Sequence, residues 1–261
     1  MIGAATLQIQ GMTRAFGGVK AVSEVDLEVG TREIVGLIGP NGAGKTTLFN
    51  LLSGLLRPDR GRMLLQGQDL THRPPHRITA AGIARTFQNV RVFERMTVLE
   101  NVMVGRHCRT RAGLGSALLK LPFERREEGR IVRQALDYLD LVGLAARSHE
   151  PAGNLPFGLL RLLEIARALA AEPQILLLDE PAAGLNTAET EQLAKLIGSL
   201  RQRGMSIILV DHDMRLVMEL SDRVAVLDQG RKIADGTPRE VQNDPRVIVA
   251  YLGETAATPE A

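Results

Sequence analysis

The sequence predicts an α/β protein with a mostly parallel core sheet, an N-terminal antiparallel β subdomain and an inserted helical subdomain. Apolar and polar residues alternate through the first thirty residues, as they do in half-buried antiparallel strands. Farther along, short continuous apolar runs alternate with helical patterns, which is typical of parallel strands that helices cover on both faces. A charged stretch with helical spacing interrupts this alternation at about residues 90–165, and we expect it to form the inserted subdomain.

The predicted elements follow these patterns in chain order. Strands are expected near Leu7–Ile9, Val22–Val29 and Glu33–Ile38, and at 62–66, 83–87, 174–178, 206–210 and 223–227. Helices are expected over 124–144 and 187–203, and where apolar residues recur at helical spacing in Leu48, Leu51, Leu52 and Leu55. A single domain is therefore predicted over residues 1–253, with a short polar tail at 254–261.

The composition is that of a folded globular chain. Of 261 residues, 44 % are hydrophobic and 24 % are charged, and the net charge is only +2. Proteins that coat nucleic acid usually carry a larger basic excess, so no nucleic-acid partner is expected. Cys108 is the single cysteine, which excludes an intrachain disulfide. No apolar run approaches the roughly 18 to 20 residues that a membrane-spanning helix needs.

The strongest local motif is a glycine-rich loop between an apolar strand and a helix. It fits the pattern G-x-x-x-x-G-K-[ST], and its residues are Gly39, Pro40, Asn41, Gly42, Ala43, Gly44, Lys45, Thr46 and Thr47. Glycines let the backbone wrap around phosphate oxygens, and the N–H groups at the start of a helix favour anions. Lys45 supplies a positive charge for the β- and γ-phosphates, and Thr46 supplies a hydroxyl ligand to Mg²⁺.

Two carboxylates stand at the end of the apolar run Ile175–Leu178. Asp179 is placed to hold Mg²⁺, directly or through water, and Glu180 is placed to polarise a water for attack on the γ-phosphate. Acidic residues often end strands as solvated turn residues, so the pair alone is weak evidence. Together with the phosphate loop, it predicts hydrolysis of a nucleotide.

These motifs, in their order and spacing, resemble the ATP-binding subunits of ABC transporters from Leu7 to Gly253. The resemblance implies a P-loop ABC cassette that binds ATP and Mg²⁺. By their positions, Phe16 would stack on adenine, Gln88 would sense Mg²⁺ and the attacking water, and His212 would contact the γ-phosphate. Each of these three also has an ordinary alternative, as a core aromatic, a surface glutamine and a histidine at a strand end.

The same resemblance assigns catalytic, metal-binding and signature residues. It implies that Glu180 and His212 are catalytic and that Thr46, Gln88 and Asp179 hold Mg²⁺. The family signature Leu-Ser-Gly-Gly-Gln corresponds to residues 155–159, where only Leu155 and Gly158 match, and the loop after the catalytic glutamate corresponds to 183–186.

The signature departs from the family pattern in a way that affects its chemistry. Pro156 replaces the serine and has neither a hydroxyl nor an N–H, and Phe157 and Leu159 replace a glycine and the glutamine. We therefore expect the N–H of Gly158 and the helix that follows to carry the contact to the ATP of a second cassette. Either hydrolysis is slow, or a partner chain has the better signature. Asn186 also stands where the family has aspartate, in a loop that contacts the partner.

A finer resemblance points to the ATPase subunits of branched-chain (hydrophobic) amino acid importers, although amide and urea importers share its features. The segments that carry it are Phe16–Gly18, Arg85–Phe93, Met96–Val102, Pro181–Asn186, Gly236–Pro238 and the closing Asp244–Gly253. The alternatives are the ATPase of a lipid or lipopolysaccharide exporter and a soluble ABC ATPase without a transport role.

The partners that the resemblance implies follow from how such importers are built. They are a second ABC ATPase subunit, two transmembrane permease subunits docking near 89–104, and, indirectly, an extracytoplasmic solute-binding protein. Val90, Val92, Phe93 and Met96 would form an apolar floor for the docking segment, and Arg91 and Arg95 a polar rim. The chain would then lie peripherally on the cytoplasmic face of the inner or plasma membrane.

Overall fold

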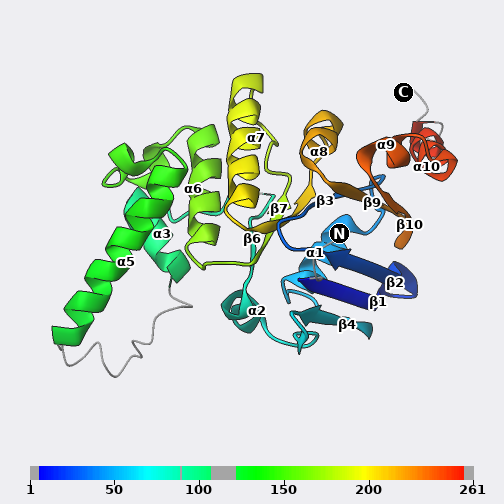
Figure 1. Cartoon of the computed structure of the whole chain (residues 1–261), viewed down its shortest axis with the longest axis horizontal. Helices are drawn as coiled ribbons and strands as arrows, with labels where there is room; N and C mark the ends of the chain where they lie inside the picture. Colours follow the sequence, from blue (N-terminus) through cyan, green and yellow to red (C-terminus); the bar gives the residue numbers. More distant parts are fainter. Residues whose placement is uncertain (1–5, 89, 107–121, 256–261) are drawn as a thin grey trace.

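The computed structural model describes residues 6–88, 90–106 and 122–255, which form two β-sheets with helices packed around them (Figure 1). The strands are β1 (Leu7–Phe16), β2 (Val19–Val29), β3 (Ile34–Ile38), β4 (Arg60–Leu65), β5 (Gln68–Asp69), β6 (Ile83–Arg85), β7 (Ile175–Asp179), β8 (Ser206–Val210), β9 (Arg223–Asp228) and β10 (Arg231–Gly236). The helices are α1 (Lys45–Leu52), α2 (Pro75–Ala81), α3 (Val98–Gly105), α5 (Pro122–Leu141), α6 (Phe157–Leu169), α7 (Thr187–Gln202), α8 (Met214–Leu220), α9 (Pro238–Gln242) and α10 (Pro245–Thr255). Two 3₁₀ turns, η2 (Ala145–Arg147) and η3 (Ala152–Asn154), lie between α5 and α6.

The larger sheet has six strands in the order β10-β9-β3-β8-β7-β6. Neighbouring strands in it run parallel, except that β10 pairs antiparallel with β9. Every residue of β3, β7 and β8 is buried. Successive side chains of a strand point to opposite faces, so each of these strands contributes to two cores. In β3, Ile34 and Ile38 join one core, whereas Val35 and Leu37 join the other. The mostly parallel sheet predicted from the apolar runs is confirmed.

The two cores have different partners across the sheet. One face packs against α6, α7 and α8 and is continuous with the interior of the helical region around α3 and α5. The other face packs against α1 and the smaller sheet, whose order is β2-β1-β4-β5. Figure 1 shows the helical region at one end and the smaller sheet below the other. Helix α1 thus shares a core with both sheets.

The smaller sheet is antiparallel, as the alternating pattern predicts. Leu7 pairs with Val29 and Ile9 with Leu27, but the register shifts farther along the two strands. Glu24 has a φ of 53°, which marks the extra residue of a bulge in β2. The bulge explains why the apolar spacing in β2 lengthens from two residues to three between Val22 and Val25.

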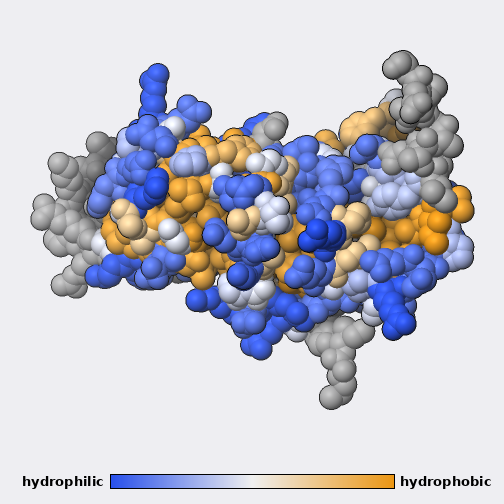
Figure 2. Space-filling model, turned by 90° about the horizontal axis from the view of Figure 1, so that it is seen from above, coloured by the Kyte–Doolittle hydropathy of each residue, from blue (hydrophilic) through white to orange (hydrophobic). Residues whose placement is uncertain are grey.

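The helical region begins with α3, whose N-terminus is stabilised by a capping box. The Thr97 side chain accepts from the N–H of Glu100, while the Glu100 side chain accepts from the N–H of Thr97. Helix α5 runs over Pro122–Leu141 instead of the predicted 124–144, and Gly143, with a φ of 76°, follows its end. From above, apolar surface gathers toward this end of the molecule between hydrophilic residues (Figure 2).

Two other predicted boundaries are corrected. Helix α1 ends at Leu52, and Leu55 lies beyond it, 50 % exposed, because Gly54 adopts a left-handed φ of 74° and breaks the helix. Helix α10 extends to Thr255, two residues into the predicted tail, and 256–261 lie outside the described residues. Within the described ranges, no helix has the length and apolar character needed to cross a bilayer.

Candidate functional site

The phosphate loop connects β3 to α1, and its glycines allow it to fold. Gly39 and Gly44 have φ values of 149° and 104°. A Cβ at Gly39 would overlap the carbonyl oxygen of Leu227, and one at Gly44 would overlap that of Ala21. Both positions therefore need glycine for conformation and for space.

The loop leaves its polar groups accessible at the start of a helix. Gly44 is the N-cap of α1 and provides no side-chain cap, and the first turn holds no acidic residue. Asn41, Gly42 and Thr46 are exposed. The ammonium of Lys45 folds back over the loop and donates to the carbonyls of Gly39 at 2.5 Å and Pro40 at 2.8 Å. A positive charge beside a helix N-terminus suits a phosphate group.

Asp179, at the end of β7, is buried in an ion pair that the sequence did not predict. Its Oδ2 accepts from Arg85 Nη2 at 2.8 Å, and both side chains are only 6 % exposed. Arg85 also donates to Asn50 Oδ1 at 2.7 Å and to Ser53 Oγ at 3.0 Å, both on or beside α1. Arg85 thereby connects the end of β7 to the helix that follows the phosphate loop.

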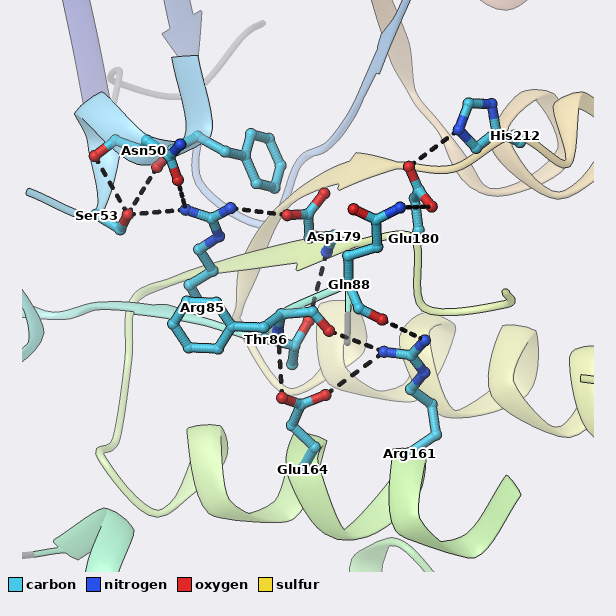
Figure 3. A network of polar contacts seen from close by, with 12 residues as sticks. Asn50, Ser53, Arg85, Thr86, Gln88, Arg161, Glu164, Asp179, Glu180 and His212 are labelled. Carbon is cyan, nitrogen blue, oxygen red and sulfur yellow. Dashed lines mark hydrogen bonds and ion pairs between the residues drawn. The ribbon is translucent and has the colours of Figure 1, made fainter. Parts of the chain in front are cut away.

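Glu180 lies between the two polar side chains that the resemblance assigned to the ATP site (Figure 3). Gln88 Nε2 donates to Glu180 Oε2 at 2.9 Å, and His212 Nε2 lies 2.9 Å from Glu180 Oε1. Each carboxylate oxygen is therefore held by a residue from a different segment. The structure brings Gln88, Glu180 and His212 together in one group of polar contacts.

The backbone around Glu180 is constrained by a residue that sequence reasoning did not single out. Glu180 has a φ of 48°, which is unusual for a residue with a side chain, and its N–H donates to the carbonyl of Val210 at 2.7 Å. Asp211 Oδ2 accepts from the N–H of Ala182 at 2.9 Å. Burial raises the pKa of Asp211, and the nearby charges of Asp213 and Glu180 raise it further.

Phe16 is not a core residue. Its side chain is 44 % exposed at the end of β1, and the guanidinium carbon of Arg14 lies 4.9 Å from the ring centroid. An exposed aromatic ring supported from one side by a cation has an available face. The structure therefore removes the core alternative for Phe16.

The signature segment begins α6, with Pro156 as its N-cap. Phe157 is 47 % exposed and packs against Gly184, where a Cβ would lie 2.8 Å from Phe157 Cε1. Gly158 faces the carboxylate of Glu189 so closely that a Cβ would overlap it. Phe157 thus shares one surface with the loop at 183–186, whereas Gly158 itself is buried beside Glu189.

Asn186 connects that surface to α7. Its side chain accepts from the N–H of Glu189 at 3.0 Å, and Glu189 Oε2 accepts from the N–H of Asn186 at 2.9 Å. Aspartate makes the same N-terminal cap. The departure from the family pattern at this position therefore preserves the local structure.

A groove of about 570 Å³ lies on the helical side of the Gln88 loop. Its lining includes Phe87, Arg91, Val92, Phe93, Val104, Glu164 and Arg167. The predicted docking residues Val92, Phe93 and Arg91 line it, whereas Val90, Met96 and Arg95 do not. Arg91 and Arg167 lie over the rings of Phe87 and Phe93, at 5.7 and 6.0 Å from the centroids. Residue 89, at the start of the predicted docking stretch, lies outside the described residues.

Sequence reasoning also missed two charged residues in α6. Arg161 and Glu164 are among its buried residues, and Arg161 donates to the backbone of the Gln88 loop. The available signal was the presence of charged residues within an otherwise apolar helical run, because a buried charge usually has a specific partner.

Comparison with known proteins gives the family. The family model described as ABC transporter matches residues 22–183, and the one described as branched-chain amino acid ATP-binding cassette transporter matches residues 231–257. The chain is 48 % identical over 249 residues to the high-affinity branched-chain amino acid transport ATP-binding protein LivG of Escherichia coli (strain K12), covering 95 % of this chain and 98 % of LivG.

Two further similarities are more distant. The lipopolysaccharide export system ATP-binding protein LptB of Haemophilus influenzae is 36 % identical over 253 residues, covering 95 % of this chain and 97 % of LptB. A solved ATP-binding cassette of an ABC transporter, in its ADP conformation, superposes with a TM-score of 0.83 at 32 % identity, covering 95 % of this chain and 99 % of the other. The chain therefore belongs to the ABC transporter family, as an ATP-binding cassette that is the ATPase of a transporter.

Proposed function

We propose that this chain is the ATP-hydrolysing subunit of an importer for branched-chain, hydrophobic amino acids. The observation that carries the catalytic part is the placement of Glu180 between Gln88 and His212, next to the strand-end Asp179. The solute class is supported by the identity to LivG over 95 % of the chain and by the family match at 231–257. The lipopolysaccharide exporter is the second candidate, at the 36 % identity to LptB.

The phosphate loop supplies the charge and the shape for the ATP phosphates. Lys45, whose ammonium already lies among loop carbonyls, would turn to the β- and γ-phosphates. Phe16 would stack on adenine with its exposed face. The N–H groups at the start of α1 would take the remaining phosphate oxygens.

The residues assigned to Mg²⁺ fit a hard cation chemically. Thr46, Gln88 and Asp179 offer a hydroxyl, an amide oxygen and a carboxylate, and Mg²⁺ in such sites takes one or two protein oxygens together with phosphates and waters. Among the described residues, no three Asp, Glu, His or Cys side chains converge as a metal cage, which agrees with a site that phosphates complete. When bound, Mg²⁺ neutralises charge on the β- and γ-phosphates.

Glu180 is the residue we assign to activating water. Its two oxygens are oriented by Gln88 and His212, so the carboxylate has a fixed direction before a water arrives. His212, with its side chain 61 % exposed, would contact the γ-phosphate. Orientation of the base, rather than its charge alone, is what this arrangement provides.

A second cassette would complete the site. Phe157, Gly184 and Asn186 form one exposed surface beside the buried Gly158, and this is where the family places the contact to the partner's ATP. Glu189 faces Gly158 and adds negative charge there, and Pro156 offers no hydroxyl. We therefore assign slow hydrolysis to a homodimer and faster hydrolysis to a heterodimer whose partner has the complete signature.

The groove beside Phe87 would receive the transmembrane permease subunits. It combines the exposed apolar side chains of Phe93 and Val104 with the guanidinium groups of Arg91 and Arg167. The chain would thus lie peripherally on the cytoplasmic face of the membrane, as one cassette over 1–253 with its helical subdomain at about 90–165. The solute-binding protein would act only through the permease.

The test is transport by the assembled complex. The chain is purified with its membrane partners, reconstituted into vesicles with the solute-binding protein, and assayed for ATP-dependent uptake of labelled leucine, urea and acetamide. Leucine uptake that Glu180→Gln abolishes, with ATP binding retained, is the expected result. Recovery with a lipopolysaccharide-exporting complex, or unchanged turnover in Glu180→Gln, contradicts the proposal.

A further inference from the structure

Arg161 and Glu164 are two buried charges on α6, one turn apart, that the ATP site as described does not use. They are only 2 % and 1 % exposed. Removing a charge from water is costly unless partners compensate, so a buried pair in an apolar helix needs an explanation. Their contacts show which part of the chain the two side chains bind.

Both residues bind the backbone of the loop that carries Gln88 (Figure 3). Arg161 Nη1 donates to the carbonyl of Phe87 and Nη2 donates to the carbonyl of Gln88, each at 2.8 Å. Glu164 Oε1 accepts from the N–H of Phe87 at 3.3 Å. The planar guanidinium thus donates hydrogen bonds to two successive carbonyls, while the carboxylate accepts one from an N–H of the same loop.

Glu164 and Arg161 also interact with each other. Burial raises the pKa of Glu164, whereas the hydrogen bond from the Phe87 N–H and the charges of Arg167 and Arg161 lower it. Arg161 Nη1 lies 3.6 Å from Glu164 Oε2, so the pair also orders itself. Together, Arg161 and Glu164 bind the N–H and carbonyl of Phe87 and the carbonyl of Gln88.

On its other side, the Gln88 loop borders the groove and solvent. The groove lies along it at Phe87 and Arg91, and the side chain of Gln88 is exposed. Its Nε2 nevertheless holds Glu180 Oε2 at 2.9 Å. The direction of the Gln88 side chain is set by its backbone, and α6 fixes that backbone at the two carbonyls.

We propose that Arg161 and Glu164 are positioning residues for ATP hydrolysis, which act by holding the Phe87–Gln88 backbone so that Gln88 stays on Glu180. The inference rests on the proposed roles of Gln88 and Glu180. Neither Arg161 nor Glu164 touches the reacting atoms. A small displacement of Gln88 is enough to lower turnover, because misplacement by about 1 Å can cost about a hundredfold in rate.

The test is a double-mutant cycle on ATPase activity of the full chain. Arg161→Lys keeps a buried positive charge beside Glu164 but cannot grip two carbonyls. We expect it to lower kcat by about tenfold or more with the KM for ATP unchanged. In a Gln88→Ala background, where the positioned side chain is absent, it should lower kcat by less than about twofold.

Arg106→Lys is the matched control. Arg106 is also buried, at 7 % exposure, and its Nη1 donates to Glu172 and to the carbonyl of Ala170, away from the Gln88 loop. Its substitution should leave kcat unchanged. Glu164→Gln is the second variant if Arg161→Lys does not fold, and circular dichroism melts establish folding for each chain. It should show the same dependence on Gln88.

Two outcomes overturn the inference and are distinguishable. If Gln88→Ala lowers kcat but Arg161→Lys lowers it by the same factor in both backgrounds, the pair acts elsewhere and the inference fails alone. If Gln88→Ala leaves kcat unchanged, the proposed role of Gln88 fails first, and the inference fails with it.

Discussion

Removing Arg85 should destabilise the protein more than removing any exposed arginine. Its guanidinium pairs with Asp179 at 2.8 Å with both side chains 6 % exposed, and it lies over the rings of Phe49 and Phe87 at 5.5 and 5.2 Å. Arg85→Met leaves the Asp179 carboxylate buried without its cation, and breaking such a pair costs about 3–5 kcal/mol.

This cost can be converted into a melting temperature. For a chain of this length, 1 kcal/mol lowers the Tm by about 2–4 °C, so we expect a fall of about 6–20 °C. Differential scanning calorimetry measures it. The control is Arg14→Met, because the Arg14–Asp59 pair has the shorter distance of 2.7 Å but is 28 % and 42 % exposed. Its loss should shift the Tm by less than about 4 °C.

A double variant tests the physical reason. In Arg85→Met/Asp179→Leu the unpaired charge is gone, so most of the lost Tm should return, because an apolar pair often replaces a buried ion pair without loss. If Arg85→Met falls no further than Arg14→Met, or if the double variant is less stable than the single one, the reasoning from burial is refuted.

Two further predictions concern the ATP site and its support. Phe16→Ala should raise the KM for ATP by about fivefold or more, because stacking of a base on an aromatic ring is worth about 1–3 kcal/mol, while the Tm stays unchanged since the ring is 44 % exposed. An unchanged KM removes Phe16 from the site. Burial raises the pKa of Asp211 above its ordinary 3.8, so its stabilising contribution is complete below 3.8 and is lost as the pH rises through the folded-state value. The stability of Asp211→Asn relative to the native chain, measured by urea unfolding, should therefore rise from pH 4 to pH 8. A relative stability that falls over this range contradicts a raised pKa for Asp211.

Much of the fold could be predicted because burial leaves a direct trace in the sequence. The strands β3, β7 and β8 are continuous apolar runs, since both of their faces are covered. Helix ends were less predictable, because a left-handed glycine such as Gly54 ends α1 regardless of the apolar spacing that continues to Leu55.

The sequence predicted the parts of the site that lie on consecutive residues. It did not predict contacts between residues that are far apart in the sequence. The phosphate loop occupies nine consecutive positions, 39–47, and its chemistry follows from their types. Arg85 and Asp179 are 94 residues apart in sequence, and nothing in either segment alone shows that they meet. Arg161 and Glu164 likewise find their partners across the fold.

Each central strand contributes side chains to two cores, and this has a consequence for how the protein unfolds. Ile34, Ile38, Val35 and Leu37 alternate between the core of the helical side and the core of the small sheet, so a single backbone segment forms the wall of both. Neither core can lose its wall while the other keeps it. The amide protons of β3, β7 and β8 should consequently exchange with solvent only through global unfolding, with both halves of the cassette released in one cooperative event.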